Sequence, residues 1–261
     1  MVRVLTVDVG NTTTRFGLFA VEAAAEPQPL GSCEFTTQQP LTCDEARIQV
    51  RQALTLLPEH AVDGAILSCV VPTLTDAWRQ ALAASCRSRP LVVGPGLKTG
   101  VRMRYDDPSE VGPDRIADVV AARATHGAPA VVVDLGTTTN FEIIDNEGAF
   151  AGGIIAPGVA LGARSLAQAA ARLPMIELRA PTRVIGRNTR AAMQSGVVFG
   201  EVARIDGLLD GAIAEAGLAD PAIIVTGEGA GAIAALLRHD AVVDDALTLR
   251  GLALLWAANR K

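Results

Sequence analysis

The sequence contains few lysines, few aromatic residues and no clustered cysteines, and each shortage argues against a class of site. Lys98 and Lys261 are the only lysines among 261 residues. A lysine-based phosphate loop is not expected, because Leu97 precedes Lys98 where that motif requires glycine. The four cysteines show no Cys-x-x-Cys spacing, so we expect no zinc site and assign them no role. Aromatic residues make up 3% of the chain, which predicts a mainly aliphatic core.

Long apolar runs and an excess of positive charge are also missing. No run approaches the roughly 20 residues that a membrane span needs, and residues 1–10 enter a strand pattern without a basic, cleavable leader. We therefore expect a cytoplasmic protein with no membrane partner. The formal net charge of −5 predicts no basic stripe for a phosphate backbone, so nucleic acid is not an expected partner.

A repeated segment is the most informative feature that the sequence does contain. VDVGNTTTRFGLF occupies residues 7–19 and VDLGTTTNFEII occupies residues 133–144. Each copy has the pattern of a strand, an Asp-x-Gly turn with a run of threonines, and a second strand. A tight structural turn would explain one copy. Two copies favour a duplicated chain with two domains of roughly 130 residues each.

The residue types in the repeat suit phosphate and cation binding. Glycine lets the backbone approach a ligand, and threonine hydroxyls with backbone N–H groups can donate to phosphate oxygens without a lysine. The carboxylates of Asp8 and Asp134 would repel phosphate unless a cation lies between them, so we expect them to hold hydrated Mg²⁺ or another cation. The two turns therefore predict a site for a nucleoside triphosphate.

The remaining chain alternates strand and helix patterns, which predicts an α/β protein. Residues 42–57 have helical spacing, with Thr42 and Glu45 placed for a capping box. Residues 113–127 predict a second helix, with proline in its first turn and Gly127 at its end. We place the domain boundary here, with an N-terminal domain of residues 1–115 and a C-terminal domain of residues 116–261.

Seven segments follow one another along the chain: DVGNTTTRFGLF, SCVVP, RYDDPSEVGPDRIADVVAA, DLGTTTNFEIID, GGIIAPG, GRNTRAAMQSGVVFG and LTLRGL. Together they resemble the type III pantothenate kinase family, within the sugar kinase, Hsp70 and actin superfamily. The resemblance implies two tandem actin-like (ribonuclease H-like) domains with a nucleotide cleft between them. It also implies a homodimer and ATP-dependent phosphorylation of pantothenate to 4′-phosphopantothenate, the first step of coenzyme A biosynthesis.

The resemblance also implies roles for individual residues. Asp114 corresponds to the proposed general base, although an ordinary helix start would also explain an aspartate there. Asp134 corresponds to the ligand of a monovalent cation, K⁺ or NH₄⁺, and Asp8 is a candidate Mg²⁺ ligand through water. The expected ATP-binding residues are Asp8, Val9, Gly10, Asn11, Thr12, Thr13, Thr14, Arg15 and Thr137. The expected pantothenate-binding residues are Tyr105, Gly112, Pro113, Asp114, Arg115 and Thr189, where Tyr105 could instead be a surface residue and Thr189 a helix cap.

Three positions depart from the family pattern. Asn140-Phe141-Glu142 replaces the usual Thr-x-Asp, Glu228 replaces one of two paired glycines, and Cys69 replaces a serine. The first departure leaves the cation preference open and the second leaves ATP binding open, whereas the third is interpreted as a packing change. Two alternatives therefore stand beside the kinase: a non-catalytic regulatory or binding relative, and a kinase for another small polyol.

Overall fold

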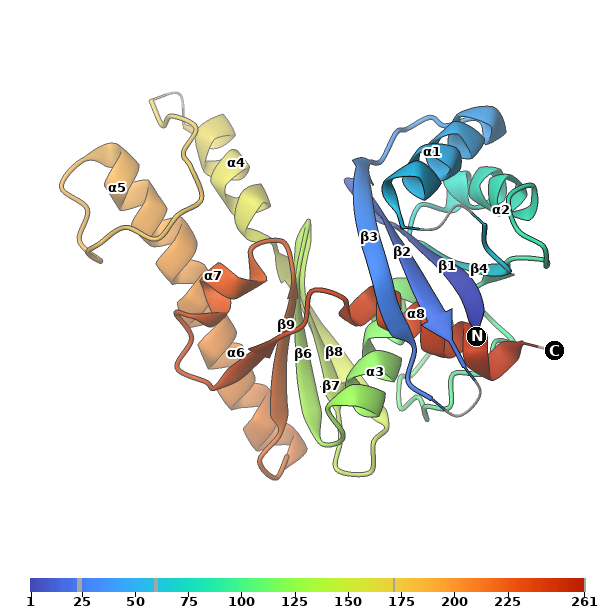
Figure 1. The fold of residues 1–261 in the computed structure, drawn as a ribbon. Helices are drawn as coiled ribbons and strands as arrows, with labels where there is room; N and C mark the ends of the chain where they lie inside the picture. The colour runs from blue at the N-terminus through green and yellow to red at the C-terminus, as the bar shows by residue number, and fades with distance from the viewer. Residues whose placement is uncertain (23–24, 59–60, 171, 261) are drawn as a thin grey trace. The chain divides into compact units, whose positions relative to one another are not determined.

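The computed structural model describes residues 1–22, 25–58, 61–170 and 172–260. Its contacts divide the chain into two compact units, one of Met1–Thr125 with Ala246–Lys261 and one of His126–Asp245 (Figure 1). These units differ from the two linear domains expected above, because the end of the chain packs with the first unit. Each unit is described by itself.

The first unit is built on a five-stranded sheet in the order β3-β2-β1-β4-β5. Strands β1, β2 and β3 form an antiparallel meander, and β4 and β5 add parallel strands on the other side of β1. This mixed arrangement brings the ends of β1 and β4 to the same edge of the sheet. The strands are β1 (Val2–Val9), β2 (Thr13–Val21), β3 (Gln28–Thr36), β4 (Gly64–Cys69) and β5 (Leu91–Val92).

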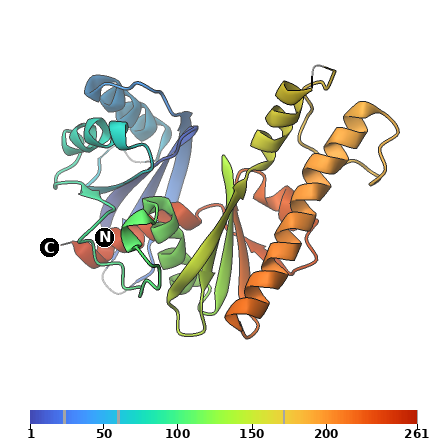
Figure 2. The ribbon, with the colours of Figure 1, turned by 180° about the vertical axis from the view of Figure 1, so that it is seen from behind.

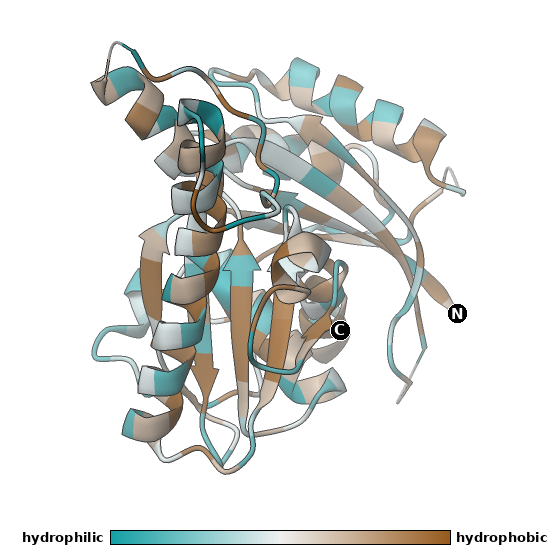
Figure 3. Ribbon diagram, turned by 90° about the vertical axis from the view of Figure 1, so that its left-hand side faces the viewer, coloured by the Kyte–Doolittle hydropathy of each residue, from teal (hydrophilic) through white to brown (hydrophobic). Residues whose placement is uncertain are grey.

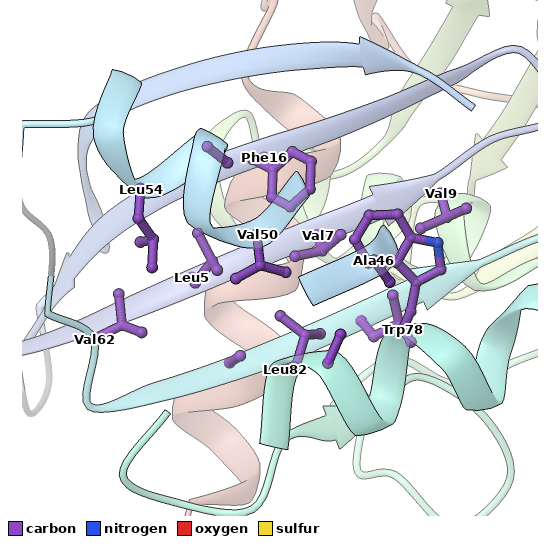
Figure 4. Close-up of a cluster of buried hydrophobic side chains, with 14 of the residues drawn as sticks. Leu5, Val7, Val9, Phe16, Ala46, Val50, Leu54, Val62, Trp78 and Leu82 are labelled. Carbon is purple, nitrogen blue, oxygen red and sulfur yellow. The ribbon is translucent and has the colours of Figure 1, made fainter. Parts of the chain in front are cut away.

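Helices α1 (Cys43–Leu56) and α2 (Thr75–Ala83) cover one face of this sheet. The predicted capping box of α1 is confirmed, since the Glu45 N–H donates to Thr42 Oγ1 at 3.3 Å and the Thr42 N–H donates to Glu45 Oε2 at 2.8 Å. Aliphatic side chains from the strands and both helices surround Phe16 and Trp78, whose rings lie 5.7 Å apart (Figure 4). Short 3₁₀ turns at Pro72–Leu74 and Pro108–Glu110 complete the connections.

The opposite face is covered by α3 (Pro113–Thr125) and α8 (Leu247–Asn259), which pack side by side (Figure 1). Gly251 allows this close approach, because a side chain there would collide with the backbone of Ala117. Gly64 likewise leaves room for the ring of Trp256. The domain boundary expected from the sequence assigned α8 to the C-terminal domain, but these contacts place it in the first unit.

The second unit repeats the mixed sheet, in the order β10-β9-β6-β7-β8. Helices α6 (Gly200–Ala216) and α7 (Ala230–Ala234) cover one face, where Val131, Val133, Phe141, Ile205 and Leu209 form the centre of the core. In Figure 3 the strands are predominantly hydrophobic, whereas the helices mix hydrophobic and hydrophilic positions. The strands are β6 (Ala130–Leu135), β7 (Thr138–Ile144), β8 (Phe150–Pro157), β9 (Ala222–Gly227) and β10 (Ala241–Val243).

Helix α4 (Val159–Ala169) follows β8, and α5 (Thr189–Gln194) continues through a π-helical turn, Ser195–Phe199, into α6. Figure 2 shows α5, this turn and α6 as one continuous rod. The cap of α5 is Asn188, whose side chain accepts from the Ala191 N–H at 2.9 Å. Thr189 is therefore the first helical residue and not the cap. Within the described ranges, no helix is both long and apolar enough to cross a membrane.

Candidate active site

The first hairpin places Asp8 at the end of β1, among polar partners on both neighbouring strands. Asp8 pairs in register with Arg15 on β2 and with Ser68 on β4. Directly paired residues project from the same face of a sheet, so the three side chains lie together. A carboxylate, a guanidinium and a hydroxyl thus meet where the hairpin turns.

The turn itself is tight and braced from outside. The Gly10 N–H donates to the carbonyl of Thr13 at 2.9 Å, and a Cβ on Gly10 would lie only 3.0 Å from that oxygen. Thr37 secures both ends of the turn, because its N–H donates to the Thr12 carbonyl at 2.9 Å and its hydroxyl to the Gly10 carbonyl at 2.8 Å. This bracing keeps the backbone of residues 10–13 in one conformation.

Asp8 lies in an environment that disfavours its charge. Burial, followed by the nearby Asp114 carboxylate, raises the pKa of Asp8 from 3.8 to about 6, although the Ser68 hydroxyl and Arg15 lower it. Its Oδ1 is shielded from solvent and has no hydrogen-bond partner among the described residues. A shielded carboxylate oxygen without a hydrogen-bond partner, with a second carboxylate near enough to raise the pKa of the first, matches the donor chemistry of a magnesium site.

Asp114 lies in the first turn of α3, as its sequence context predicts. Burial raises its pKa, while the Arg115 N–H, which donates to Asp114 Oδ1 at 2.9 Å, and the Arg115 charge lower it. A side chain at Gly112 would collide with Asp114 Oδ1, so a substitution there would displace the carboxylate from this position. The local backbone therefore holds the carboxylate in a defined orientation.

Arg115 and Tyr105 complete this part of the first unit. Arg115 is only 6% exposed, and its Cζ lies 5.9 Å from the centre of the Tyr105 ring. A guanidinium over an aromatic face is an attractive arrangement. The structure thus brings together Tyr105, Asp114 and Arg115, which the sequence comparison had grouped as substrate-binding residues. Thr189 lies in the second unit with an exposed side chain.

The second hairpin has the same plan with different partners. Asp134 pairs in register with Asn140 on β7 and with Thr226 on β9. The side-chain oxygens of Asn140 and Thr226 are buried and have no hydrogen-bond partner among the described residues. Glu142 lies two residues further along the same face and is fully buried. This group of oxygen donors suits a hard cation.

Thr137 lies in the second turn and touches the end of β8. The Gly158 N–H donates to the Thr137 carbonyl at 3.1 Å. A side chain on Gly158 would collide with the carbonyl of Gly136 and would lie 2.8 Å from that of Thr137. Backbone therefore packs directly on backbone at this point, where the last residues of the stretch 152–158, Pro157 and Gly158, adjoin the turn.

The turn that follows β9 explains how Glu228 is tolerated. Gly227 and Gly229 have φ angles of +90° and +75°, but Glu228 between them is not in the left-handed region. Gly227 also approaches the Leu135 carbonyl too closely for any side chain. The glycine that is missing from the family pattern therefore stands at a position with no such conformational requirement.

A cavity of about 190 Å³ opens beside this turn within the second unit. Its lining is mainly apolar and includes groups from the turns that follow β6 and β9. The residues that matter most for its chemistry are Leu135, Gly136, Thr139, Val198, Glu228 and Gly229. Such a lining suits a flat ring with a polar edge.

Sequence reasoning missed several polar residues that lie beside the two hairpins. Ser68 carries no motif signal beyond its place in SCVVP. Glu201 and Arg204 stand three residues apart on α6, and both bond to groups near the second turn. In the sequence, Glu201 and Arg204 stand out only as a charged pair on a helix with many small and apolar residues. No group of three His, Cys, Asp or Glu side chains forms a metal cluster in the part of the chain described here.

Two α/β units, each with a mixed five-stranded sheet that carries an Asp-x-Gly hairpin, place the protein in the actin-like class of ATPase folds. The family profile described as type III pantothenate kinase matches residues 4–211. The type III pantothenate kinase of Halalkalibacterium halodurans is 37% identical over 262 residues, which cover 98% of this chain and 99% of the relative. The chain belongs to the type III pantothenate kinase family.

Solved structures agree on the fold. A conserved Baf family protein from Campylobacter jejuni superposes with a TM-score of 0.60 at 21% identity, covering 98% of both chains. The activator of 2-hydroxyisocaproyl-CoA dehydratase from Clostridium difficile, solved with bound ADPNP, has a TM-score of 0.53 at 12% identity, covering 98% of this chain and 92% of the other. At these identities the similarity concerns the fold alone.

Proposed function

We propose that this protein transfers the γ-phosphoryl group of ATP to pantothenate and forms 4′-phosphopantothenate, the first step of coenzyme A biosynthesis. The observation that carries the proposal is the half-buried carboxylate of Asp114 at the start of α3, close enough to Asp8 to raise the pKa of Asp8. This pair occurs in a chain that matches type III pantothenate kinases over 98% of its length.

Asp114 serves as the general base in this proposal. It accepts the proton of the 4′-hydroxyl while that oxygen attacks the γ-phosphorus and the bond to the ADP oxygen breaks. A raised pKa suits this role, because a carboxylate with an ordinary pKa is a weaker base. Arg115 pairs with the pantothenate carboxylate, and Tyr105 covers the pantoyl methyl groups. Gly112, Pro113 and Thr189 supply further contacts.

The nucleotide is bound by the braced turn and by the second hairpin. Residues Asp8–Arg15 surround the phosphates, Thr137 adds a contact, and the cavity beside Gly229 receives the adenosine. Asp8 holds Mg²⁺ through water, which its buried and unpaired Oδ1 supports. When bound with ATP, Mg²⁺ neutralises charge on the phosphates.

A monovalent cation, K⁺ or NH₄⁺, is proposed at Asp134. The buried oxygens of Asn140 and Thr226, in register with Asp134, fit such an ion. The substitution of the family's Thr-x-Asp thus retains oxygen donors on this face. We also propose that the protein is a cytoplasmic homodimer, as the family resemblance implies.

The test is release of ADP from purified protein with ATP, Mg²⁺ and pantothenate, with K⁺, NH₄⁺ or Na⁺ as the only monovalent cation. We expect turnover that requires pantothenate and rises with K⁺ or NH₄⁺. Turnover only with another small polyol from a substrate panel would reassign the substrate. A folded protein that is silent with every substrate and salt would be a non-catalytic relative, and Asn140, Glu142 and Glu228 would be examined first.

A further inference from the structure

A buried hydrogen-bond network joins the second hairpin to α6. The Thr139 hydroxyl donates to Glu201 Oε1 at 2.6 Å, and Glu201 Oε2 pairs with Arg204 Nη2. The same nitrogen of Arg204 donates to the Pro157 carbonyl at 2.5 Å. Thr139 is fully buried and Glu201 is 4% exposed, so the network lies mostly away from water. It connects β7, α6 and the end of β8.

This network holds the turn that carries Thr137 from two directions. Thr139 lies two residues after Thr137 and is tied to α6 through Glu201. On the other side, Gly158 donates to the Thr137 carbonyl and follows Pro157, which Arg204 secures. Any movement of the turn would therefore break a bond to a buried charge or separate closely packed backbone.

The helix segment before Glu201 contributes to its placement. The π-helical turn Ser195–Phe199 ends immediately before Gly200, where α6 begins. Such turns add a residue to a helix and change the direction of the following side chains. Glu201 and Arg204 then lie one turn apart on a common face, so one carboxylate reaches both Thr139 and Arg204.

We propose that Thr139, Glu201 and Arg204 are positioning residues for the nucleotide. Together they hold Thr137 and the cavity wall, of which Thr139 is part, in the geometry that binds ATP. This inference rests on the proposed function. The physical reason is that a buried carboxylate with fixed donors is rigid, and a binding site is only as accurate as the shell that supports it. The bonds of the network reach the turn with Thr137 and the end of β8, so we expect its main effect on ATP binding.

The test uses Thr139→Val, which removes the donor at nearly constant shape, and Thr139→Ser, which keeps it. Arg204→Met removes the partner of the Glu201 carboxylate. We expect Thr139→Val and Arg204→Met to weaken binding of a non-hydrolysable ATP analogue by about tenfold, measured by calorimetry. KM for ATP rises by a similar factor and KM for pantothenate is unchanged. Thr139→Ser stays close to the wild type.

Arg79→Met is the matched control, because Arg79 pairs with Asp76 at the same i,i+3 spacing on the exposed surface of α2. It should leave the affinity for the analogue unchanged. If Thr139→Val and Arg204→Met unfold at lower urea concentration but bind the analogue normally, the network is purely structural and the inference is wrong. A wild-type protein that binds no analogue would refute both the proposed function and this inference. Binding by the wild type is therefore measured first, which separates that outcome from a failure of the inference alone.

Discussion

The two hairpins share one motif but surround their aspartates with different charges. Asp8 has Arg15 opposite it on the neighbouring strand, whereas Asp134 has Asn140. The first turn is one residue longer, which brings a different side chain into register. Two residues further along the same face, the first hairpin has Gly17 and the second has the buried Glu142. The first hairpin therefore supplies its own positive charge, and the second offers only oxygen donors.

From this difference we expect the two hairpins to bind different ligands. The first hairpin belongs to the unit with Asp114, and a cation bound beside both carboxylates would relieve the repulsion between Asp8 and Asp114. The second hairpin offers the oxygen donors at which a monovalent cation is proposed. Duplication thus provided two similar scaffolds, and a few paired residues decide what each one binds.

The largest effect is expected from Asp114→Asn, which removes the base near the first hairpin. The amide cannot accept the proton of the hydroxyl, so kcat should fall by about a thousandfold, while the affinity for ATP is retained. Steady-state kinetics and calorimetry measure the two quantities. Asp76→Asn is the control, because Asp76 also lies in a first helical turn but on the surface of α2. An unchanged kcat in Asp114→Asn would refute the role of this residue.

Asp8→Asn should separate activity from stability. Because the folded protein holds the Asp8 proton more tightly than the unfolded chain, stability falls as pH rises from 3.8 to about 6 and stays lower above it. The ionised carboxylate then costs about 3 kcal/mol at neutral pH. The variant should be more stable than the wild type at pH 7, and its stability should change less between pH 3.8 and about 6. Its activity should be about a hundredfold lower. Urea unfolding at several pH values tests this, and a variant less stable than the wild type at pH 7 would contradict it.

Asp134→Asn should change the response to monovalent cations. Loss of the charged ligand weakens the proposed cation site, so the K⁺ concentration for half-maximal activity should rise by about tenfold or more. Activity titrated with K⁺ at constant ionic strength provides the measurement. Asp240→Asn, at an exposed position of the same unit, is the control. An identical K⁺ response in Asp134→Asn and the wild type would show that the hairpins do not differ in this way.

Cys69→Ser should have the smallest effect, although Cys69 pairs with Val9 next to the first turn. The thiol donates to the Val71 carbonyl at 3.2 Å, and a serine hydroxyl can do the same. Stability should change by less than about 1 kcal/mol, and kcat and KM by less than about twofold. Thermal unfolding and steady-state kinetics suffice. A large loss of activity would show that the thiol does more than fill space.

Local features of the fold were predictable because they depend on neighbouring residues. The capping box of Thr42 and Glu45 and the helix that begins at Pro113 follow from short-range rules, and both are observed. The duplicated hairpin was likewise visible as a strand-turn-strand pattern. Helix α8 was different, since nothing in its own sequence shows that Gly251 packs on Ala117 rather than within the second unit.

The candidate site also has features that the sequence predicts and features that depend on the tertiary structure. Its motif residues, including Asp8, Asp114 and Asp134, could be selected from the sequence and from the family resemblance. The raised pKa of Asp8 could not, because it depends on burial and on a carboxylate 106 positions away in the chain. The Thr139–Glu201 bond joins residues 62 positions apart and carries no motif.

By itself, the sequence determined the α/β class, the duplication, the family and the candidate polar residues of the site. Only the tertiary structure decided which helix belongs to which unit, which charges face each other and which donors are buried. The physical reason is that hydrogen-bonding rules and side-chain periodicity act over a few residues. Burial and electrostatic interactions instead depend on distance in space, which the chain sets only when it folds.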